Sequence, residues 1–135
     1  MDGVLMRPND QEFLYVQGNG DFLNWANANL GDLDASISDF NSWVLQVQGP
    51  TALDLMTAVT GIDHNAFSYY AVTEAEINGL ACYISRSGWT GERGFEIYSK
   101  DDDFDGVALW QYLLRDHRAQ AITLFGLKHC EFIGQ

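Results

Sequence analysis

Apolar stretches separated by turn-forming residues organise the first part of the chain. Residues 3–6 and 12–17 are rich in apolar side chains and flank Arg7-Pro8-Asn9-Asp10, which is typical of a turn, so they predict a β-hairpin. Apolar residues then recur at helical spacing across residues 22–26, directly after Asp21, whose side chain can cap a helix. The pattern therefore predicts a hairpin followed by a short helix.

The same two periodicities predict the rest of the chain. The predicted strands cover residues 43–48, 67–73, 80–86, 94–98 and 121–124. Two helices are predicted among them, one with Leu53, Met56 and Val59 as its apolar stripe and one with Phe104, Val107, Trp110 and Leu114 on one face. Paired strands mixed with helices predict an α+β fold, mainly antiparallel sheets with helices packed on them. We expect two small lobes, roughly residues 1–48 and 49–135.

Composition and charge narrow the function classes. Hydrophobic residues make up 47% of the 135 residues, which is enough for a packed core. The formal net charge of −12 argues against binding nucleic acid or an anionic membrane surface. No apolar run approaches the roughly 20 residues that span a bilayer. Cys82 and Cys130 have neither metal-site nor disulfide-scaffold spacing, and a reducing, cytoplasmic setting is expected.

Several common motifs are absent from the sequence. It contains no GxGxxG or P-loop for nucleotides, no GxSxG turn for a hydrolase nucleophile and no HExxH-like metal spacing. The three histidines are scattered, and each is expected to be a surface or hydrogen-bonded residue. Asp101-Asp102-Asp103 is expected to mark the start of a helix, because successive residues cannot all face one metal ion. We expect no metal site.

The glycine-rich segment of residues 85–98 is the most informative part of the chain. Its three glycines within seven residues indicate a tight turn or a close approach of backbone to ligand, and Trp89 lies inside this turn. Glu96 stands between Phe95 and Ile97, so on a strand its side chain points to the opposite face from both. The pattern leaves open whether that face meets solvent or a ligand.

This segment resembles the glycine-rich signature of the aminomethyltransferase family, the T-protein of the glycine cleavage system and its relatives. Leu45-Gln46-Val47-Gln48-Gly49-Pro50 resembles the family's strand, Gln-Gly-Pro and helix, and Tyr69-Tyr70 stands where the family has an aromatic pair. The start of the chain, Asp2-Gly3-Val4-Leu5 through Phe13-Leu14-Tyr15-Val16, resembles the segment around the family's reactive-site aspartate. These matches keep their order and cover nearly the whole chain.

The resemblance implies tetrahydrofolate as the cofactor and assigns expected roles to individual residues. Glu96 corresponds to the carboxylate that binds the pterin, whose adjacent N–H donors suit two carboxylate oxygens. Tyr69, Tyr70 and Trp89 correspond to the aromatic walls for the flat rings, although ordinary core packing is the alternative for each. Asp2 corresponds to the reactive-site aspartate, or it is simply a frayed terminal residue.

The implied activity is transfer of a one-carbon group from a small donor to tetrahydrofolate. Thr90-Gly91-Glu92 favours the aminomethyltransferase branch, whereas Ser87-Gly88-Trp89 and Leu109-Trp110 favour relatives that demethylate dimethylsulfoniopropionate. A non-catalytic folate-binding or interaction module is the alternative of another class.

The chain departs from the family pattern at both ends. The resemblance implies a preceding lobe, an arginine-bearing segment and a C-terminal β-barrel, and no arginine follows Arg118. We therefore expect a partial domain that has little activity alone and self-associates through surfaces that the missing lobes leave open.

Overall fold

The computed structural model describes residues 2–18, 20–101 and 103–115, which form two antiparallel sheets and three α-helices. The first sheet is the hairpin of β1 (Gly3–Met6) and β2 (Leu14–Gln17), and α1 (Phe22–Asn29) follows it. Asp21 caps α1 by accepting a hydrogen bond from the backbone N–H of Asn24. The predicted hairpin and the helix after it are confirmed.

The second sheet has four strands in the order β3-β6-β5-β4, with every neighbouring pair antiparallel. Its strands are β3 (Val44–Gln48), β4 (Val72–Ile77), β5 (Leu80–Ser85) and β6 (Gly94–Ser99). The helices α2 (Ala52–Thr60) and α3 (Gly106–Arg115) and a short 3-10 helix (His64–Ala66) complete the described chain. The α+β fold with mainly antiparallel sheets is therefore confirmed.

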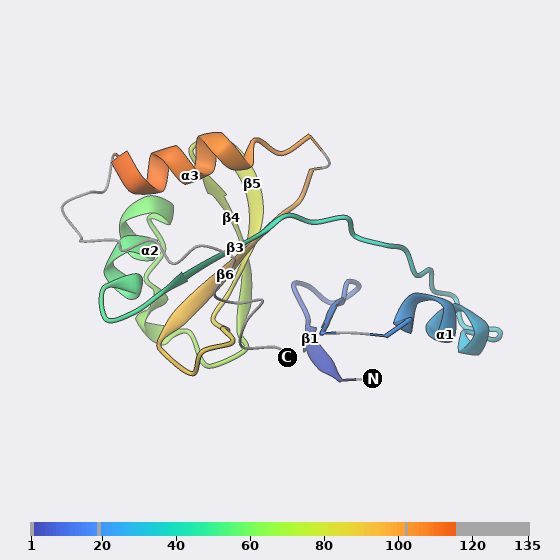
Figure 1. Ribbon diagram of the computed structural model, residues 1–135. Coiled ribbons are helices and arrows are strands. Elements are labelled where there is room, and N and C mark those ends of the chain that lie inside the picture. Colours follow the sequence, from blue (N-terminus) through green and yellow to red (C-terminus); the bar gives the residue numbers. More distant parts are fainter. Residues whose placement is uncertain (1, 19, 102, 116–135) are drawn as a thin grey trace.

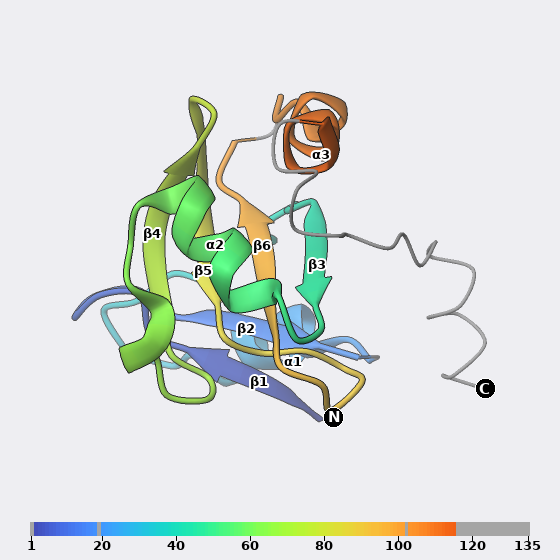
Figure 2. The ribbon, with the colours of Figure 1, turned by 90° about the vertical axis from the view of Figure 1, so that its left-hand side faces the viewer.

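The four-stranded sheet lies between two layers. Figure 1 shows α2 on one side of the sheet and the hairpin on the other, and Figure 2 shows the same sheet seen from the α2 side. β3 falls at the end of the first expected lobe, yet it pairs with β6 along its whole length. The four-stranded sheet thus draws its strands from both sides of residue 48.

The main core lies between the sheet and its helices. Its buried residues are Ala52, Leu53, Leu55, Met56, Val59, Ile77, Cys82, Ile84, Phe95, Ile97, Leu109 and Leu113. Burying each of the larger side chains contributes about 1.5–3 kcal/mol, so this cluster is the main source of stability. Burial also raises the pKa of the Cys82 thiol to about 11, as expected for a small core residue rather than a reactive one.

A second, smaller core attaches the hairpin to the opposite face of the sheet. Met6 and Leu14 of the hairpin pack against Tyr83 and Tyr98 of the sheet. The Tyr83 hydroxyl donates a hydrogen bond of 3.0 Å to Glu12, which lies in the hairpin loop. The hairpin therefore covers this face with both apolar and polar contacts.

The strand predicted over residues 67–73 is wrong for most of its length. β4 begins at Val72, and the chain before it turns, with a positive φ of 65° at Tyr70. A residue with positive φ lies outside the extended backbone region and does not continue a strand. Asn78-Gly79 joins β4 to β5 as a two-residue turn, and both residues have the positive φ values that such a turn requires.

The face predicted for the last helix is also wrong. In α3 the buried residues are Leu109 and Leu113, whereas Val107 is 66% and Trp110 37% exposed. Apolar residues occupy much of the circumference of this helix, so spacing alone did not select the buried side. Val107 and Trp110 instead line an open apolar pocket of about 720 Å³ between α3 and β3.

Other expectations lie outside the described residues or stay open. The predicted strand at 121–124 and Cys130 fall outside the described residues. Within the part of the chain that the structure describes, no helix is long and apolar enough to cross a membrane. Self-association stays a prediction, and sedimentation at increasing concentration tests it.

Gly3 allows a close approach within the hairpin that a larger residue would prevent. A Cβ at Gly3 would lie 2.5 Å from the backbone oxygen of Val16, whereas a Cβ at Gly18 would meet no atom within 4 Å. We expect Gly3→Ala to lower the free energy of unfolding by about 1–3 kcal/mol, as other overpacking substitutions do. Urea denaturation measures this, with Gly18→Ala as the matched control. Equal stability of the two variants would contradict the close approach.

His64 makes the stability of the fold dependent on pH. It is buried beside α2, and Thr60 Oγ1, 2.9 Å from Nε2, already donates to the carbonyl of Met56, so Nε2 carries the imidazole proton. Burial lowers the pKa of His64, an effect that Asp63 partly offsets. A lowered folded-state pKa means that the neutral imidazole stabilises the fold.

The pKa of His64 in the unfolded chain is about 6.5, and above this pH the neutral imidazole contributes its full stabilisation. The stabilisation is lost as the pH falls from there toward the lower pKa of the folded state. We expect the free energy of unfolding in urea to fall more in the native chain than in His64→Gln between pH 7.5 and 5.5. Asp63 does not titrate between pH 7.5 and 5.5, because the pKa of its carboxyl is lowered. Its stabilising effect is lost only in stronger acid. Parallel pH profiles would show that His64 does not titrate on unfolding.

Candidate functional site

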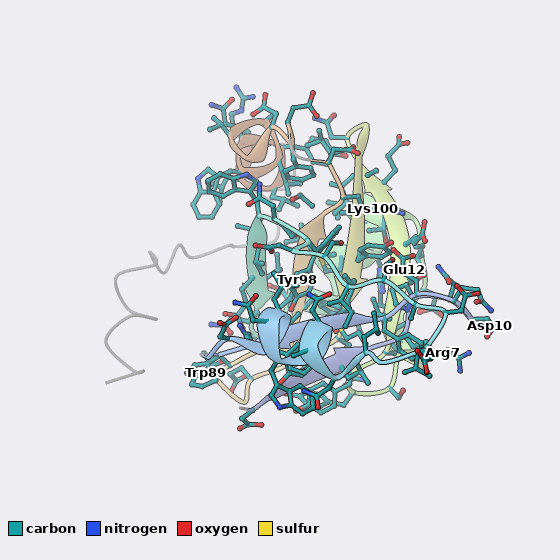
Figure 3. All side chains as sticks on the ribbon, turned by 90° about the vertical axis from the view of Figure 1, so that its right-hand side faces the viewer. Arg7, Asp10, Glu12, Trp89, Tyr98 and Lys100 are labelled. Atoms are coloured by element: carbon teal, nitrogen blue, oxygen red, sulfur yellow. The ribbon has the colours of Figure 1, made fainter. Side chains whose placement is uncertain are left out.

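The candidate site is built on the central strand β6, whose side chains alternate between the two layers. Phe95 and Ile97 are fully buried in the core beneath the helices. Glu96 and Tyr98 therefore point to the opposite face, toward the hairpin, as the sequence predicted for Glu96. Figure 3 shows Tyr98 between the sheet and the hairpin layer.

Strand register places polar side chains on both sides of Glu96. Gln46 of β3 and Ser85 of β5 are its direct partners in the antiparallel ladders. Ser87 lies just beyond the end of β5, and both serines are buried. Side chains opposite one another in adjacent strands share a face and lie within contact distance. A polar cluster thus lies on the hairpin-facing side of the sheet, around Glu96.

Two hydroxyl groups donate to the same oxygen of Glu96. Oε2 accepts hydrogen bonds from the Ser87 hydroxyl and from the Tyr98 hydroxyl, the latter at 2.8 Å. Oε1 has no hydrogen bond within the described chain, and it is not sealed from solvent. The carboxylate thus has one occupied oxygen and one open oxygen.

Tyr98, Ser85 and Ser87 are protonated so that the hydroxyls of Tyr98 and Ser87 can donate to Glu96. Burial, and then the adjacent Glu96 charge, raise the pKa of Tyr98, so its phenol keeps its proton and acts as a donor. The Oγ atoms of Ser85 and Ser87 lie 3.0 Å apart. Because a hydroxyl has one proton and the carboxylate is the stronger acceptor, Ser85 is left as the donor to Ser87.

The amide of Gln46 is the unpaired member of the cluster. Its Nε2 is buried and has no hydrogen-bond partner among the described residues. Gly88 packs against it, since a Cβ at Gly88 would lie 2.8 Å from Nε2. The first glycine of the glycine-rich turn thus lies directly over the polar cluster.

The expected aromatic residues gather beside this turn, and they are open to solvent. Tyr69 and Tyr70 are 48% and 51% exposed, and Trp89 is 67% exposed. The two tyrosine rings meet edge to face with centroids 4.5 Å apart, and the Tyr69 hydroxyl donates to the Gly88 carbonyl at 3.5 Å. None of these three residues is part of a core cluster. The fold therefore brings Tyr69, Tyr70 and Trp89 to the turn that adjoins Glu96.

Arg86 binds the segment that carries Tyr69 and Tyr70 to the end of β5. Its guanidinium donates to the carbonyl of Phe67. Its backbone accepts from the N–H of Tyr70 and donates to the carbonyl of Ala71, both at 3.0 Å. These contacts hold Tyr69 and Tyr70 at the turn although they are not part of a strand.

The structure places Asp2 at the exposed start of the hairpin, directly before β1. Its side chain is exposed, and its backbone carbonyl accepts from the N–H of Gly18 at 3.4 Å. No hydrogen bond or ion pair among the described residues joins Asp2 to Glu96 or Trp89. Figure 1 shows the start of β1 apart from the turn around residue 90.

Sequence reasoning missed four members of the cluster: Gln46, Ser85, Ser87 and Tyr98. Gln46, Ser85 and Tyr98 lie in strands beside apolar core residues, so a strand pattern could have placed each of them on the face opposite the main core. Ser87 lies beyond the end of β5, where no strand pattern applies. The sequence could not have shown that these residues meet, because the pairing register of two distant strands cannot be determined from either strand alone. Within the described residues no group of histidine, cysteine and acidic side chains could hold a metal ion.

Comparison with known proteins identifies the family. The family model of the GCVT N-terminal domain matches residues 1–133. The chain belongs to this family. The resemblance stated from the glycine-rich segment is thereby confirmed.

Named relatives agree with this assignment. An aminomethyltransferase of Moorella thermoacetica is 31% identical over 94% of this chain and 36% of its own length. An aminomethyltransferase of Alkaliphilus oremlandii is 34% identical over the same shares of both chains. A probable aminomethyltransferase of Thermococcus kodakarensis is 40% identical over 53% of this chain and 18% of its own. The chain spans about a third of the length of the first two relatives.

The role of Arg86 can be tested without any ligand. We expect Arg86→Ala to release the segment before β4, because the partly buried carbonyl of Phe67 loses its charged donor. Hydrogen exchange at the amides of Tyr70 and Ala71 should accelerate about tenfold or more, which corresponds to a loss of about 1.4 kcal/mol. Arg93→Ala is the matched control, since Arg93 is exposed on the same loop. Unchanged exchange in Arg86→Ala would refute this support.

Proposed function

We propose that this chain supplies the tetrahydrofolate-binding part of an aminomethyltransferase, which transfers a one-carbon group from a small donor to the folate. The single observation that carries the proposal is the open oxygen of the Glu96 carboxylate beside the exposed aromatic residues of the glycine-rich turn. Membership of the family supplies the class of reaction. A cytoplasmic setting is part of the proposal.

The chemistry of the site fits a pterin. A pterin presents ring N–H donors at one edge and flat apolar faces, so it needs an acceptor at the edge and aromatic surface along the faces. Glu96 Oε1 would supply the acceptor. Tyr69, Tyr70 and Trp89 would supply the surface, and the bound ring would cover area that now meets water. The folate nitrogen carries the one-carbon group, and these residues bind and orient the ring.

Asp2 has a separate place in the proposal. A carboxylate near the reacting nitrogen would orient it and stabilise positive charge that develops there. No hydrogen bond among the described residues joins Asp2 to Glu96, so the proposal needs Asp2 to approach the bound folate from the hairpin. A non-catalytic binding module is the competing class. Retention of folate affinity in Asp2→Asn, together with loss of transfer in the whole enzyme, would distinguish the two.

The identity of the one-carbon donor is open to a direct comparison. Trp89 adjoins the site, whereas Trp110 lines the pocket between β3 and α3. The two segments that favour a sulfonium donor are therefore in different places, and an aminomethyl donor is the leading proposal. Supplying dimethylsulfoniopropionate and a protein-bound aminomethyl group in parallel to the whole enzyme distinguishes these donors by which one yields a folate product.

Glu96→Gln tests the folate-binding role. The substitution keeps the shape of the side chain and removes the charge that strengthens its hydrogen bond to a ring N–H. We expect affinity for tetrahydrofolate to fall by about 2–3 kcal/mol, roughly thirty- to a hundredfold or more in Kd. Isothermal titration calorimetry measures this, with melting temperatures recorded alongside. Glu92→Gln is the matched control, because Glu92 is exposed on the same turn. Equal affinities of the native chain and Glu96→Gln would remove Glu96 from the folate site.

A further inference from the structure

We propose that residues 121–124 form a fifth strand along the free edge of β3 and cover the apolar pocket between β3 and α3. The segment, Ala121-Ile122-Thr123-Leu124, lies outside the described residues. A second copy of the chain is the competing occupant of the same edge. Folate binding is not involved, because Leu45 and Ile97 line the pocket from the helix side of the sheet, whereas Glu96 points to the hairpin side.

β3 is an edge strand, and no described strand pairs with its outer side. In an antiparallel ladder, successive residues direct their backbone groups alternately at the partner strand and away from it. The carbonyl of Trp43 accepts from the N–H of Ser99 at 2.9 Å, and the N–H of Gly49 donates to the carbonyl of Arg93 at 2.8 Å. The odd-numbered residues of β3 therefore bond to β6. The even-numbered residues turn their N–H and C=O groups to the open edge, where such groups are a template for another strand.

The apolar pocket lies beside this edge. Trp43 of the chain before β3 and Val107 of α3 line it, and they are 68% and 66% exposed. Apolar surface that is exposed to this extent and gathered in one place marks an area that another element covers. A strand paired with β3 would direct alternate side chains to the helix side of the sheet, next to Leu45 and under α3. Those side chains would enter the pocket.

The segment at residues 121–124 has the chemistry that this place requires. Ile122 and Leu124 share one face of a strand, and both are large and apolar. Thr123 stands between them and faces the other side, and residues 119–127 carry no charged side chain. The family model extends to residue 133, so the segment belongs to the same domain as β3. Ile122 and Leu124 are the side chains that would fill the pocket.

The connection from α3 suits a strand beside β3. α3 ends at Arg115, and Leu113 in its last turn is part of the main core. Ala121 follows Arg115 by six residues, and an extended chain of that length spans about 20 Å. β3 has five residues and is about 17 Å long. A fifth strand antiparallel to β3 is parallel to β6, and a helix such as α3 is the usual connection between parallel strands.

Hydrogen exchange in the native chain, residues 1–135, tests this pairing at the amides of Val44 and Gln46. Their N–H groups point to the open edge and are protected by hydrogen bonds only if another strand accepts from them. We expect both amides to exchange about tenfold or more faster in Ile122→Asp, because a carboxylate is excluded from an apolar pocket. The amide of Leu45, which bonds to β6, reports whether the sheet itself stays intact.

Ala119→Asp is the matched control. It adds the same charge to the same segment, but before the predicted strand. The amides of Val44 and Gln46 should exchange in this variant as they do in the native chain. Unprotected exchange of both amides in the native chain would overturn the proposal. Equal acceleration in Ala119→Asp and Ile122→Asp would show a general effect of charge and would overturn it as well.

Val107→Asp tests the same contact from the α3 side of the pocket. Val107 is exposed and belongs to neither core cluster, so its replacement leaves the described fold intact even if Ile122→Asp does not fold. If the segment packs in the pocket, the amides of Val44 and Gln46 should accelerate about tenfold in this variant too, while Leu45 stays protected. Unchanged exchange in Val107→Asp would exclude the pocket as the place where the segment docks.

A dilution series separates the segment from a second copy of the chain. Pairing within one chain gives the same exchange rates at every protein concentration, whereas pairing between copies weakens on dilution. We expect the rates at Val44 and Gln46 to be independent of concentration. Rates that rise on dilution would assign the edge to a second copy and would overturn the proposal. Each of these measurements is made without folate, so the outcome of folate titration does not affect them.

Discussion

The alternation of side chains along β6 is the constraint on which the fold and the candidate site both depend. β6 is an inner strand with a neighbour on each side, so its register fixes β3 and β5 together. Phe95 and Ile97 fill the core beneath the helices, and Glu96 faces the hairpin. A slip of one residue would place the carboxylate in an apolar core, at a cost of several kcal/mol. The same pairing that stabilises the core therefore orients the polar cluster.

The sequence predicted the parts of this arrangement that are local. Phe95-Glu96-Ile97 alternates within three residues, and Asn78-Gly79 can form its turn without help from the rest of the chain. The partners of Glu96 are not local. Gln46 precedes it by about 50 residues, and it becomes a neighbour only because β3 pairs with β6. The identity of Glu96 as a candidate was therefore accessible from sequence, whereas the hydrogen bonds that orient it required the structure.

The two wrong predictions have a common physical cause, which is that tertiary contacts overrode local preference. Tyrosine favours strands, yet Tyr70 has positive φ, and Arg86 holds its segment to the end of β5 from outside the ladder. In α3 two apolar faces competed, and the sheet selected the one with Leu109 and Leu113. In both places the excluded aromatic side chains remain at the surface. At Tyr70 they adjoin the candidate site, and at Trp110 they line an open pocket.

The hairpin gives the polar cluster a dry side and an open side. Met6 and Leu14 cover Tyr98, so water is excluded from the donors that meet Glu96 Oε2, and hydrogen bonds are stronger in such surroundings. Oε1 lies on the other side of the same carboxylate, where solvent can reach it. The hydrogen bonds to Oε2 hold the Glu96 carboxylate in place, so it does not reorganise when Oε1 binds a ligand. Such preorganisation lowers the entropic cost of binding. The fold thus presents a charged acceptor that is rigid, yet still accessible from the glycine-rich turn.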